Sequence, residues 1–146
     1  MKKYLLLSVA LVFAGSNAWA EDSELPTSGT CGTDCTWSYD ESTKTIKITG
    51  NESGTGVMED YTYTSYIENT NHRYIISAPW AGYRDIAENV TIEGISNIGK
   101  KAFLDFGNIK HIEMDDNITS LGGDSFGNLY HLETIKLSNN LTSLGG

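Results

Sequence analysis

The residues best suited to chemistry are two cysteines, Cys31 and Cys35, which three residues separate. Two thiols at this spacing can close one disulfide bond in the oxidising conditions outside the cytoplasm. Free thiols are the first alternative and a metal site is the second, because structural zinc needs four ligands and His72, His111 and His131 show no matching spacing. We favour the disulfide, whose small loop limits its stabilisation to the low end of about 2–4 kcal/mol.

Two acidic turns, residues 115–117 and residues 123–125, carry the oxygen atoms that bind calcium in other proteins. Neither turn has the ligand number of a known calcium loop, so we interpret both as solvated turns. The sequence also contains no nucleophile elbow, phosphate loop, zinc-protease motif or dinucleotide fingerprint. We therefore predict no catalytic residue, no metal and no cofactor, and a protein that is not an enzyme.

The first twenty residues have the layout of a secretory signal peptide. Lys2 and Lys3 are followed by an apolar run over residues 4–14, and Ala18-Trp19-Ala20 places small residues at a cleavage site. The run is shorter than the ~20 residues of a membrane span; an uncleaved anchor or a short buried helix is the alternative. We expect cleavage between Ala20 and Glu21, a secreted, cell-surface or periplasmic location, and no membrane insertion afterwards.

The chain is acidic, with a formal net charge of −9 that becomes −11 if Lys2 and Lys3 leave with the signal peptide. Such a chain repels phosphate backbones, which argues against nucleic-acid binding. It is also a poor ligand for anionic membrane surfaces. The charge favours solubility and cationic partners but identifies none.

A repeat with a sequence spacing of 23 is the strongest pattern in the chain, and repeats of this length are typical of solenoids. The shared positions of consecutive units are Ile95/Ile118/Leu141, Ile98/Leu121/Leu144, Gly99/Gly122/Gly145, Phe103/Phe126, Phe106/Leu129, Ile109/Leu132, Ile112/Ile135 and Met114/Leu137. Val90 and Ile92 precede Ile112 and Met114 at an offset of only 22, so one residue is missing near Gly94.

Each unit begins with a short segment of alternating apolar and polar residues, centred on Thr91, Glu113 or Lys136. Alternation predicts a strand with one buried face, and Glu113 and Lys136 are expected to be favourable neighbours in a stack. A turn with positive φ would explain the repeat glycines, and a short helical turn is expected after them. One unit alone buries too little apolar surface to stay folded, so the units must stack.

The segments before the repeats predict a cap. Residues 21–30 are expected to form a loose leader, and residues 31–88 an N-terminal cap module, with strands over 36–39 and 45–49 joined by a hairpin turn. Trp37 and Trp80 are expected to cover the end of the first repeat. The tyrosines of residues 61–74 are either a binding surface, since Tyr is common at hot spots, or rings that cover the cap core, which we favour.

The fold class predicted is a β-rich leucine-rich repeat solenoid, with parallel strands, short helical turns and an N-terminal β-hairpin cap. The repeats occupy residues 89–146, about two and a half units with no evident C-terminal cap. The last repeat stops part-way, at Leu144-Gly145-Gly146. An exposed apolar repeat end of this kind favours end-to-end self-association.

Several ordered motifs between residues 29 and 146 resemble the BspA-like leucine-rich repeat proteins. They are Gly29-Thr30-Cys31-Gly32, Cys35-Thr36-Trp37, Ile46-Lys47-Ile48-Thr49-Gly50, Gly56-Val57-Met58-Glu59-Asp60-Tyr61, Pro79-Trp80, and Ile98-Gly99 followed by Ala102-Phe103. The chain departs from the family in having Phe106 and Leu129 where a Cys is common, and in the length of residues 62–77. The resemblance implies a secreted or surface protein, and adhesion to matrix proteins as in some members.

We therefore expect recognition or adhesion outside the cytoplasm, without catalysis. The partner is expected to be an extracellular protein or glycan, bound on the polar strand face at Thr91, Glu113 and Lys136. Two alternatives stand beside this expectation. The chain could be a structural cap or spacer from a longer surface protein, or an exported hydrolase whose acid–base pair is not visible in the spacing.

Overall fold

The computed structural model describes residues 24–145, and the expected signal peptide and its cleavage site lie outside this range. Within it the chain is almost entirely strand and turn, with one 3₁₀ helix, η2 (Ala81–Tyr83). The strands are β1 (Ser28–Thr33), β2 (Cys35–Asp40), β3 (Thr45–Thr49), β4 (Gly56–Met58), β5 (Tyr63–Glu68), β6 (Asn71–Ile76), β7 (Asn89–Glu93), β8 (Ile95–Ile98), β9 (His111–Met114), β10 (Ser120–Leu121), β11 (Thr134–Lys136) and β12 (Ser143–Leu144). A membrane-crossing helix is absent from residues 24–145.

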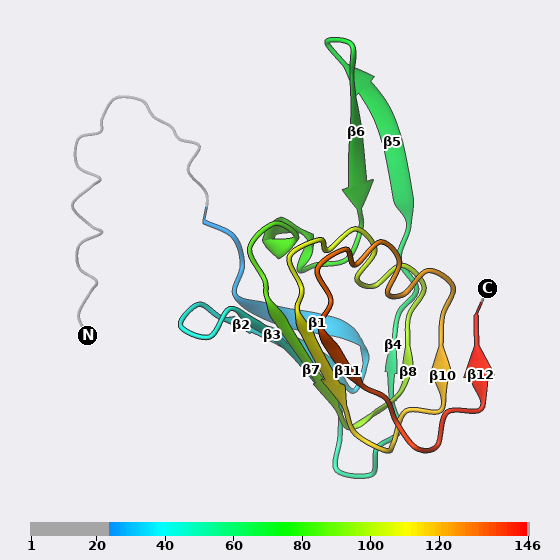
Figure 1. The fold of residues 1–146 in the computed structure, drawn as a ribbon. Coiled ribbons are helices and arrows are strands. Elements are labelled where there is room, and N and C mark those ends of the chain that lie inside the picture. Colours follow the sequence, from blue (N-terminus) through cyan, green and yellow to red (C-terminus); the bar gives the residue numbers. More distant parts are fainter. Residues whose placement is uncertain (1–23, 146) are drawn as a thin grey trace, which may run out of the picture.

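Ten of these strands form one sheet that curls back on itself (Figure 1). Strands β3, β7, β9 and β11 pair in parallel and form one wall, here called the front wall. Strands β4, β8, β10 and β12 also pair in parallel and form the back wall. The antiparallel strands β1 and β2 join the two walls, because β2 pairs with β3 and β1 pairs with β4.

One turn of the solenoid, with one front strand and one back strand, is here called a coil. The sequence offset between paired residues of neighbouring coils equals the spacing of the sequence repeat. Strand β9 pairs with β11 at an offset of 23, with Ile112 opposite Ile135. Strand β7 pairs with β9 at an offset of 22, with Val90 opposite Ile112. Gly94 alone separates β7 from β8, and it does so with a φ of 76° that favours glycine. Its N–H donates to Oδ2 of Asp115 at 2.8 Å, which ties this short turn to the next coil.

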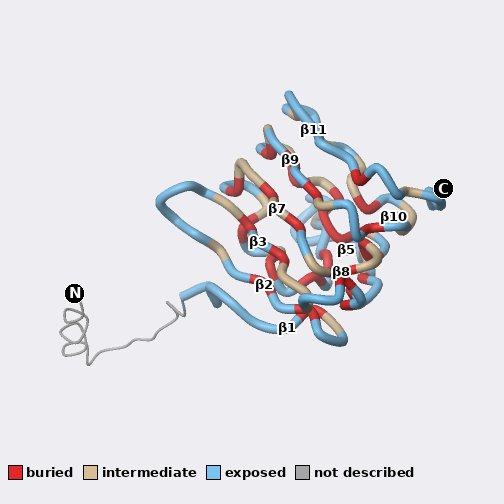
Figure 2. The backbone as a smooth tube through the Cα atoms, turned by 90° about the horizontal axis from the view of Figure 1, so that it is seen from below, coloured by how far each residue is buried: buried red, intermediate tan, exposed pale blue. Residues whose placement is uncertain are grey.

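The core lies between the two walls (Figure 2). The inward residues of the front wall, each 2% exposed or less, are Ile46, Ile48, Val90, Ile92, Ile112 and Met114. Behind them three rings stack in a column, with Phe103 5.3 Å from Trp80 and 5.7 Å from Phe126 between ring centroids. Successive rings of the column are offset by 23 in the sequence, so Trp80 occupies the phenylalanine position of the preceding coil. Its indole N–H donates to the Ala102 carbonyl at 2.8 Å.

The repeat glycines serve close packing of the backbone. None of Gly99, Gly122 and Gly145 has a positive φ, so the expectation of a left-handed turn there was wrong. A Cβ atom added at Gly99 would lie 1.7 Å from the Glu59 carbonyl oxygen, and one at Gly122 would lie 2.6 Å from the Lys100 nitrogen. Consecutive coils approach so closely at this corner that no side chain fits.

The limb that returns from the back wall to the front wall is a series of turns, and the expected short helical turn after the repeat glycines was wrong. Lys101 and Asp105 have φ values of 58° and 64°, and their equivalents in the next coil, Asp124 and Asn128, have values of 55° and 59°. A left-handed residue at every fourth position interrupts any right-handed helix. The side chains follow the repeat as well, because Nδ2 of Asn128 donates to Oδ1 of Asp105 at 2.6 Å.

The N-terminal segment is more regular than the sequence indicated. Strand β1 begins at Ser28, inside the segment expected to be a loose leader. The turn between β2 and β3 is built on Asp40, whose Oδ1 accepts the Ser42 N–H at 2.8 Å and the Ser42 hydroxyl at 2.6 Å. These hydrogen bonds lower the pKa of Asp40, so the turn is stabilised by the ionised carboxylate.

Residues 62–77 form an arm that projects from the body (Figure 1). Strands β5 and β6 pair antiparallel in a sheet of their own. On the back wall Val57 pairs with Asn97 at an offset of 40, although the repeat spacing is 23. The arm is therefore an insertion into the first coil, and it accounts for the unusual length of this segment.

Candidate functional site

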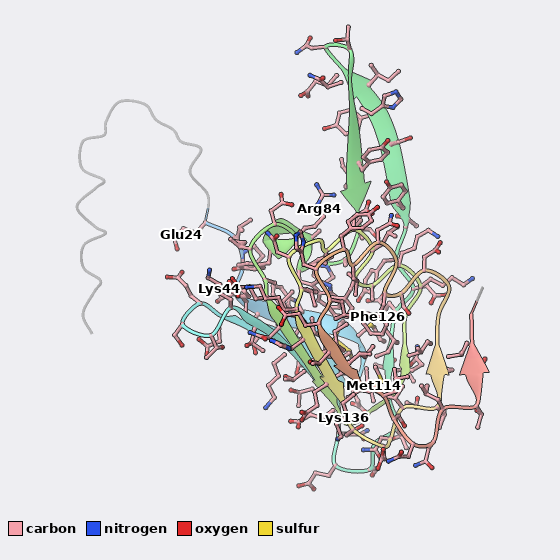
Figure 3. All side chains as sticks on the ribbon, in the orientation of Figure 1. Glu24, Lys44, Arg84, Met114, Phe126 and Lys136 are labelled. Carbon is pink, nitrogen blue, oxygen red and sulfur yellow. A yellow bond between two sulfur atoms is a disulfide. The ribbon has the colours of Figure 1, made fainter. Side chains whose placement is uncertain are left out.

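The polar side of the front wall brings the predicted contact residues together. Side chains alternate along a strand, so the residues between the buried positions face outward. Thr91 pairs with Glu113 and Glu113 pairs with Lys136, so the three form one row across β7, β9 and β11. Lys47 of β3 pairs with Thr91 and extends this row to a fourth strand. Figure 3 labels Lys136, which belongs to the last strand of the wall.

A second row of polar side chains runs beside the first. It consists of Thr45, Asn89, His111 and Thr134, which are register partners across the same four strands. Nδ1 of His111 lies 2.8 Å from the Thr134 hydroxyl, a hydrogen bond between neighbouring coils. All residues of the two rows except Lys47 line an open groove of about 410 Å³. The two rows and this groove are here called the polar face.

The polar face carries both signs of charge. Lys47 and Glu93 form an ion pair at 3.2 Å, with both side chains about half exposed. Glu113 and Lys136 are register neighbours, but no ion pair joins them in the described part of the chain, so both charges face solvent. Hydrogen bonds from the backbone and side chain of Asn139, and then the charge of Lys136, lower the pKa of Asp116.

One carboxylate holds the edge of the polar face at which the front strands begin. Glu88 accepts from Nζ of Lys44 and from Nζ of Lys110, each at 3.1 Å. These two hydrogen bonds lower the pKa of Glu88. Because Lys44, Glu88 and Lys110 precede β3, β7 and β9, the pairs join three successive coils where their front strands begin.

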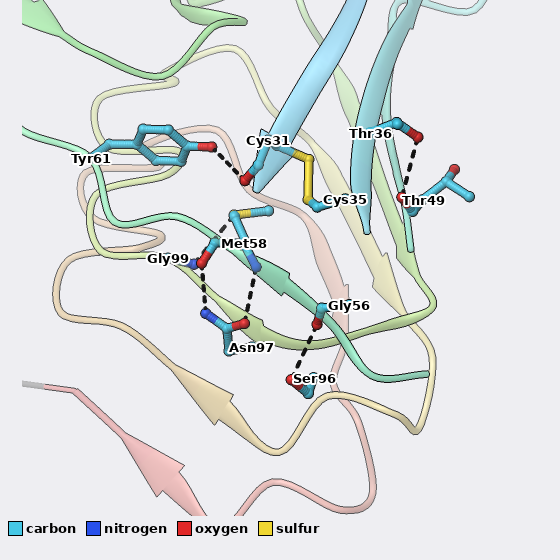
Figure 4. The surroundings of a disulfide bond; sticks show 10 residues. All are labelled: Cys31, Cys35, Thr36, Thr49, Gly56, Met58, Tyr61, Ser96, Asn97 and Gly99. Atoms are coloured by element: carbon cyan, nitrogen blue, oxygen red, sulfur yellow. Dashed lines mark hydrogen bonds between the residues drawn. A yellow bond between two sulfur atoms is a disulfide. The ribbon is translucent and has the colours of Figure 1, made fainter. Parts of the chain in front are cut away.

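The predicted disulfide between Cys31 and Cys35 is present, and both residues are buried (Figure 4). The hydroxyl of Tyr61 donates to the Cys31 carbonyl at 3.3 Å, and burial raises the pKa of Tyr61. Close by, Asn97 binds the backbone of Met58 twice, accepting its N–H and donating to its carbonyl at 3.0 Å each. This region fixes the junction of β1, β4 and β8, away from the polar face.

The acidic turns use their carboxylates to join coils. Asp115 accepts hydrogen bonds from Gly94 and from Asn117, and Asp116 accepts the Asn139 N–H at 2.8 Å. Asp124 lies 3.2 Å from Nζ of Lys101. Across residues 24–145, no cluster of three or more His, Cys, Asp or Glu side chains is arranged to hold a metal ion.

The tyrosines divide into two groups. Tyr61 is buried and Tyr63 is half-buried, in agreement with the interpretation as core rings. Tyr66 and Tyr74 are 41% and 43% exposed on the arm, so that interpretation was wrong for them. Aromatic and β-branched residues are frequent in residues 63–67 and 74–76, and the polar Asn69-Thr70 lies between these segments. This composition is the signal that would have predicted a hairpin.

The comparisons with known proteins agree with the repeat architecture. The BspA type leucine rich repeat region matches residues 59–146 in six copies, beginning before residue 89, where the spacing placed the first repeat. A leucine-rich repeat protein from Eubacterium ventriosum ATCC 27560 is similar in structure, with a TM-score of 0.60 and 23% identity over 82% of this chain. The chain spans only 28% of that protein, and the likeness shows the fold alone. Among curated proteins none matches significantly. The repeat match over more than half of its residues shows that the chain belongs to the BspA type leucine-rich repeat family.

Proposed function

We propose that this protein is a non-catalytic recognition protein that acts outside the cytoplasm and binds an extracellular protein or glycan through the polar face. The observation that carries the proposal is the alignment of eight polar side chains in two rows, seven of which line one open groove. These side chains offer hydroxyl, amide, imidazole, ammonium and carboxylate groups, which suit a partner rich in hydrogen-bonding groups.

The rigidity of the wall supports this use. On β3, β7 and β9 the outward residues alternate with side chains that are almost fully buried, such as Ile48, Ile92 and Met114. A face held in this way loses little conformational freedom when it binds, so less of the contact energy is spent on ordering. The balance of Lys47 and Lys136 against Glu93 and Glu113 favours a polar partner of low net charge over a phosphate-rich one.

The export of the protein is part of the proposal. Its support is the layout of residues 1–20 and membership of a family whose proteins are typically secreted or on the cell surface. A disulfide between Cys31 and Cys35 is consistent with an oxidising compartment. N-terminal sequencing of the chain recovered from outside the producing cells tests this part, and it should begin at Glu21.

The test of recognition is a binding screen followed by charge changes on the polar face. The purified chain is applied to an array of extracellular-matrix proteins and glycans, and each hit is compared with the variants Glu113→Lys and Lys136→Glu. Matched controls are Glu52→Lys and Lys100→Glu, exposed positions outside the polar face. We expect the face variants to weaken binding about tenfold or more, the effect of losing one good polar contact, and the controls to bind normally.

The proposal fails if the face variants and the controls bind alike. It also fails if the chain turns over glycosidase or peptidase substrates, because that result would favour an exported hydrolase. Both measurements use the same purified material, and circular dichroism of each variant shows whether it is folded.

A second proposal concerns the open end of the stack, where the repeats could continue. Ile135, Leu137 and Leu144 are 39%, 45% and 72% exposed, whereas Ile112 and Met114, one coil earlier, are 2% and 0% exposed. Strands β11 and β12 are the two ends of the ten-stranded sheet. This end suits another coil, supplied by a longer surface protein or by end-to-end association, and the chain would then serve as a spacer. End-to-end association is supported if the mass in solution rises with concentration and Leu144→Lys abolishes this rise. A mass that Leu144→Lys leaves unchanged contradicts it.

A further inference from the structure

The arm lies outside the polar face and interrupts the repeat, so neither recognition at that face nor stacking of the repeats explains its exposed apolar residues. Its large apolar side chains are unusually open, with Ile67 68% and Ile75 53% exposed. The base of the arm is well anchored, because Ile76 is 3% exposed and the Ser77 N–H donates to the Thr62 carbonyl at 3.0 Å. The arm is therefore anchored at its base, while the apolar side chains of its outer part are exposed to solvent.

The outer edge of β5 is the open edge of the arm. Strands β5 and β6 pair only with each other within the described residues, and a strand edge with exposed apolar side chains is a template for another strand. The β6 edge already has a contact, since Nη1 of Arg84 donates to the Tyr74 carbonyl at 3.4 Å. A two-stranded hairpin is marginally stable in water, and a third or fourth strand stabilises it.

The direction of the backbone groups on β5 follows from the antiparallel ladder. The hydrogen bond between Ser77 and Thr62 makes these two residues a bonded pair. Bonded and non-bonded pairs alternate along such a ladder, and Tyr63 pairs with Ile76 next to it. The N–H and C=O groups of Tyr63, Ser65 and Ile67 therefore point outward, away from β6.

We propose that β5 pairs with β5 of a second copy of this chain, antiparallel, around a two-fold axis at Ser65. In this register Tyr63 lies opposite Ile67 of the second copy, and Thr64 lies opposite Tyr66. Every off-axis pair within the span from Tyr63 to Ile67 then joins an aromatic ring to a β-branched side chain, a favourable cross-strand combination. The pairing is self-complementary, as a two-fold interface requires, and it covers Ile67, the most exposed apolar residue of the arm.

The charge of the arm also fits a second copy. Residues 63–76 carry one acidic and one basic residue, Glu68 and Arg73, so the arm is formally neutral although the whole chain carries −9. In the proposed register Glu68 lies opposite Thr62, so no like charges meet across the interface. Because the arm projects from the body (Figure 1), two arms can meet while the acidic bodies stay apart.

Pairing of the arms would join two polar faces in one particle. Two linked binding faces raise the overall affinity for a repetitive partner, because the second contact becomes intramolecular. The four-stranded sheet formed from two hairpins would also stabilise both arms. This inference goes beyond the proposed function, and it can fail while the polar face still binds.

The test uses charges placed on the proposed two-fold axis. Sedimentation velocity gives the dimer dissociation constant of the purified chain and of the variants Ser65→Lys and Ser65→Asp. Each variant places two like charges directly opposite each other, so we expect each dissociation constant to rise about tenfold or more. An equimolar mixture of the two variants places opposite charges there and should restore dimers that contain one copy of each.

The controls are Ser53→Lys and Ser53→Asp, at an exposed turn of the body, which should dimerise like the parent chain. Native mass spectrometry of the mixture identifies the mixed dimer directly. The proposal is overturned if the parent chain stays monomeric up to about 100 μM, a concentration at which even a weak specific contact is populated. A dimer that the Ser65 variants leave intact, or that only Leu144→Lys breaks, overturns it equally.

Discussion

Phe103 offers the sharpest prediction about stability. The side chain is fully buried, stacks between Trp80 and Phe126, and meets the edge of Phe106 at 5.6 Å between centroids. Replacing Phe103 with alanine removes the middle ring of the column and leaves a cavity. Such a change costs about 3–5 kcal/mol, a large part of the roughly 5–15 kcal/mol that stabilises a domain.

The position of each ring in the column sets a gradient. Phe126 is half-buried and stacks on one side, against Phe103, so Phe126→Ala should cost about 2 kcal/mol, below the range for a fully buried ring. Tyr130 is 78% exposed, and Tyr130→Ala should change the stability by less than about 0.5 kcal/mol. The order of losses expected is therefore Phe103, then Phe126, then Tyr130.

Urea unfolding followed by tryptophan fluorescence measures these losses, since Trp80 is part of the column. A loss of about 4 kcal/mol lowers the midpoint by about 2 M at an ordinary denaturant slope. If Phe103→Ala does not fold, Phe103→Leu should still lose about 1–1.5 kcal/mol, mainly the ring contacts. Equal losses at Phe103 and Phe126, or a Phe103 loss as small as that at Tyr130, would refute the column as the central packing element.

Three further predictions concern the contacts between coils. Asn97→Leu leaves the N–H and C=O of Met58 without their partners, so unfolding free energy should fall by about 1–3 kcal/mol; an unchanged urea midpoint would count against this clamp. Reduction of the Cys31–Cys35 bond should cost about 2 kcal/mol, as expected for a small loop, and equal midpoints with and without reductant would contradict a stabilising role. The folded pKa of Glu88 lies below its ordinary value of 4.5, so its ion pairs stabilise the fold above pH 4.5 and are lost as pH falls through the folded pKa. The midpoint difference between the parent chain and Glu88→Gln should therefore shrink on acidification below 4.5, and a constant difference would exclude this linkage.

The spacing of the sequence was sufficient to predict the later coils. Alternation around Thr91, Glu113 and Lys136 predicted short strands, and their offsets of 22 and 23 recur in the strand pairing. The row that these residues form follows directly from that register. Lys47 was missed because the arm separates β3 and β4 from the later coils and hides the repeat, so β3 was interpreted as part of the cap.

Other features depended on contacts that spacing alone does not describe. The first ring of the column, Trp80, was not recognised as part of the repeat. It lies 23 residues before Phe103, but it is a tryptophan where the later coils have phenylalanine. The glycines were explained by φ, whereas their role is to allow close backbone packing. A Cβ atom added at Gly99, Gly122 or Gly145 would lie only 1.7–2.6 Å from the backbone of the preceding coil. The arm turns at Asn69 and Thr70, both with positive φ, and threonine is an uncommon signal for such a turn.

The central claim is that the polar face is the surface that recognises a partner, and carboxyl footprinting tests it most directly. The chain is labelled at its acidic side chains with and without a partner found in the array, and mass spectrometry reports each site. We predict that Glu93 and Glu113 of the front wall become protected, while Glu52 and Glu59, exposed outside it, are labelled as before. Protection of Glu52 or Glu59 with Glu93 and Glu113 still fully labelled would contradict the claim.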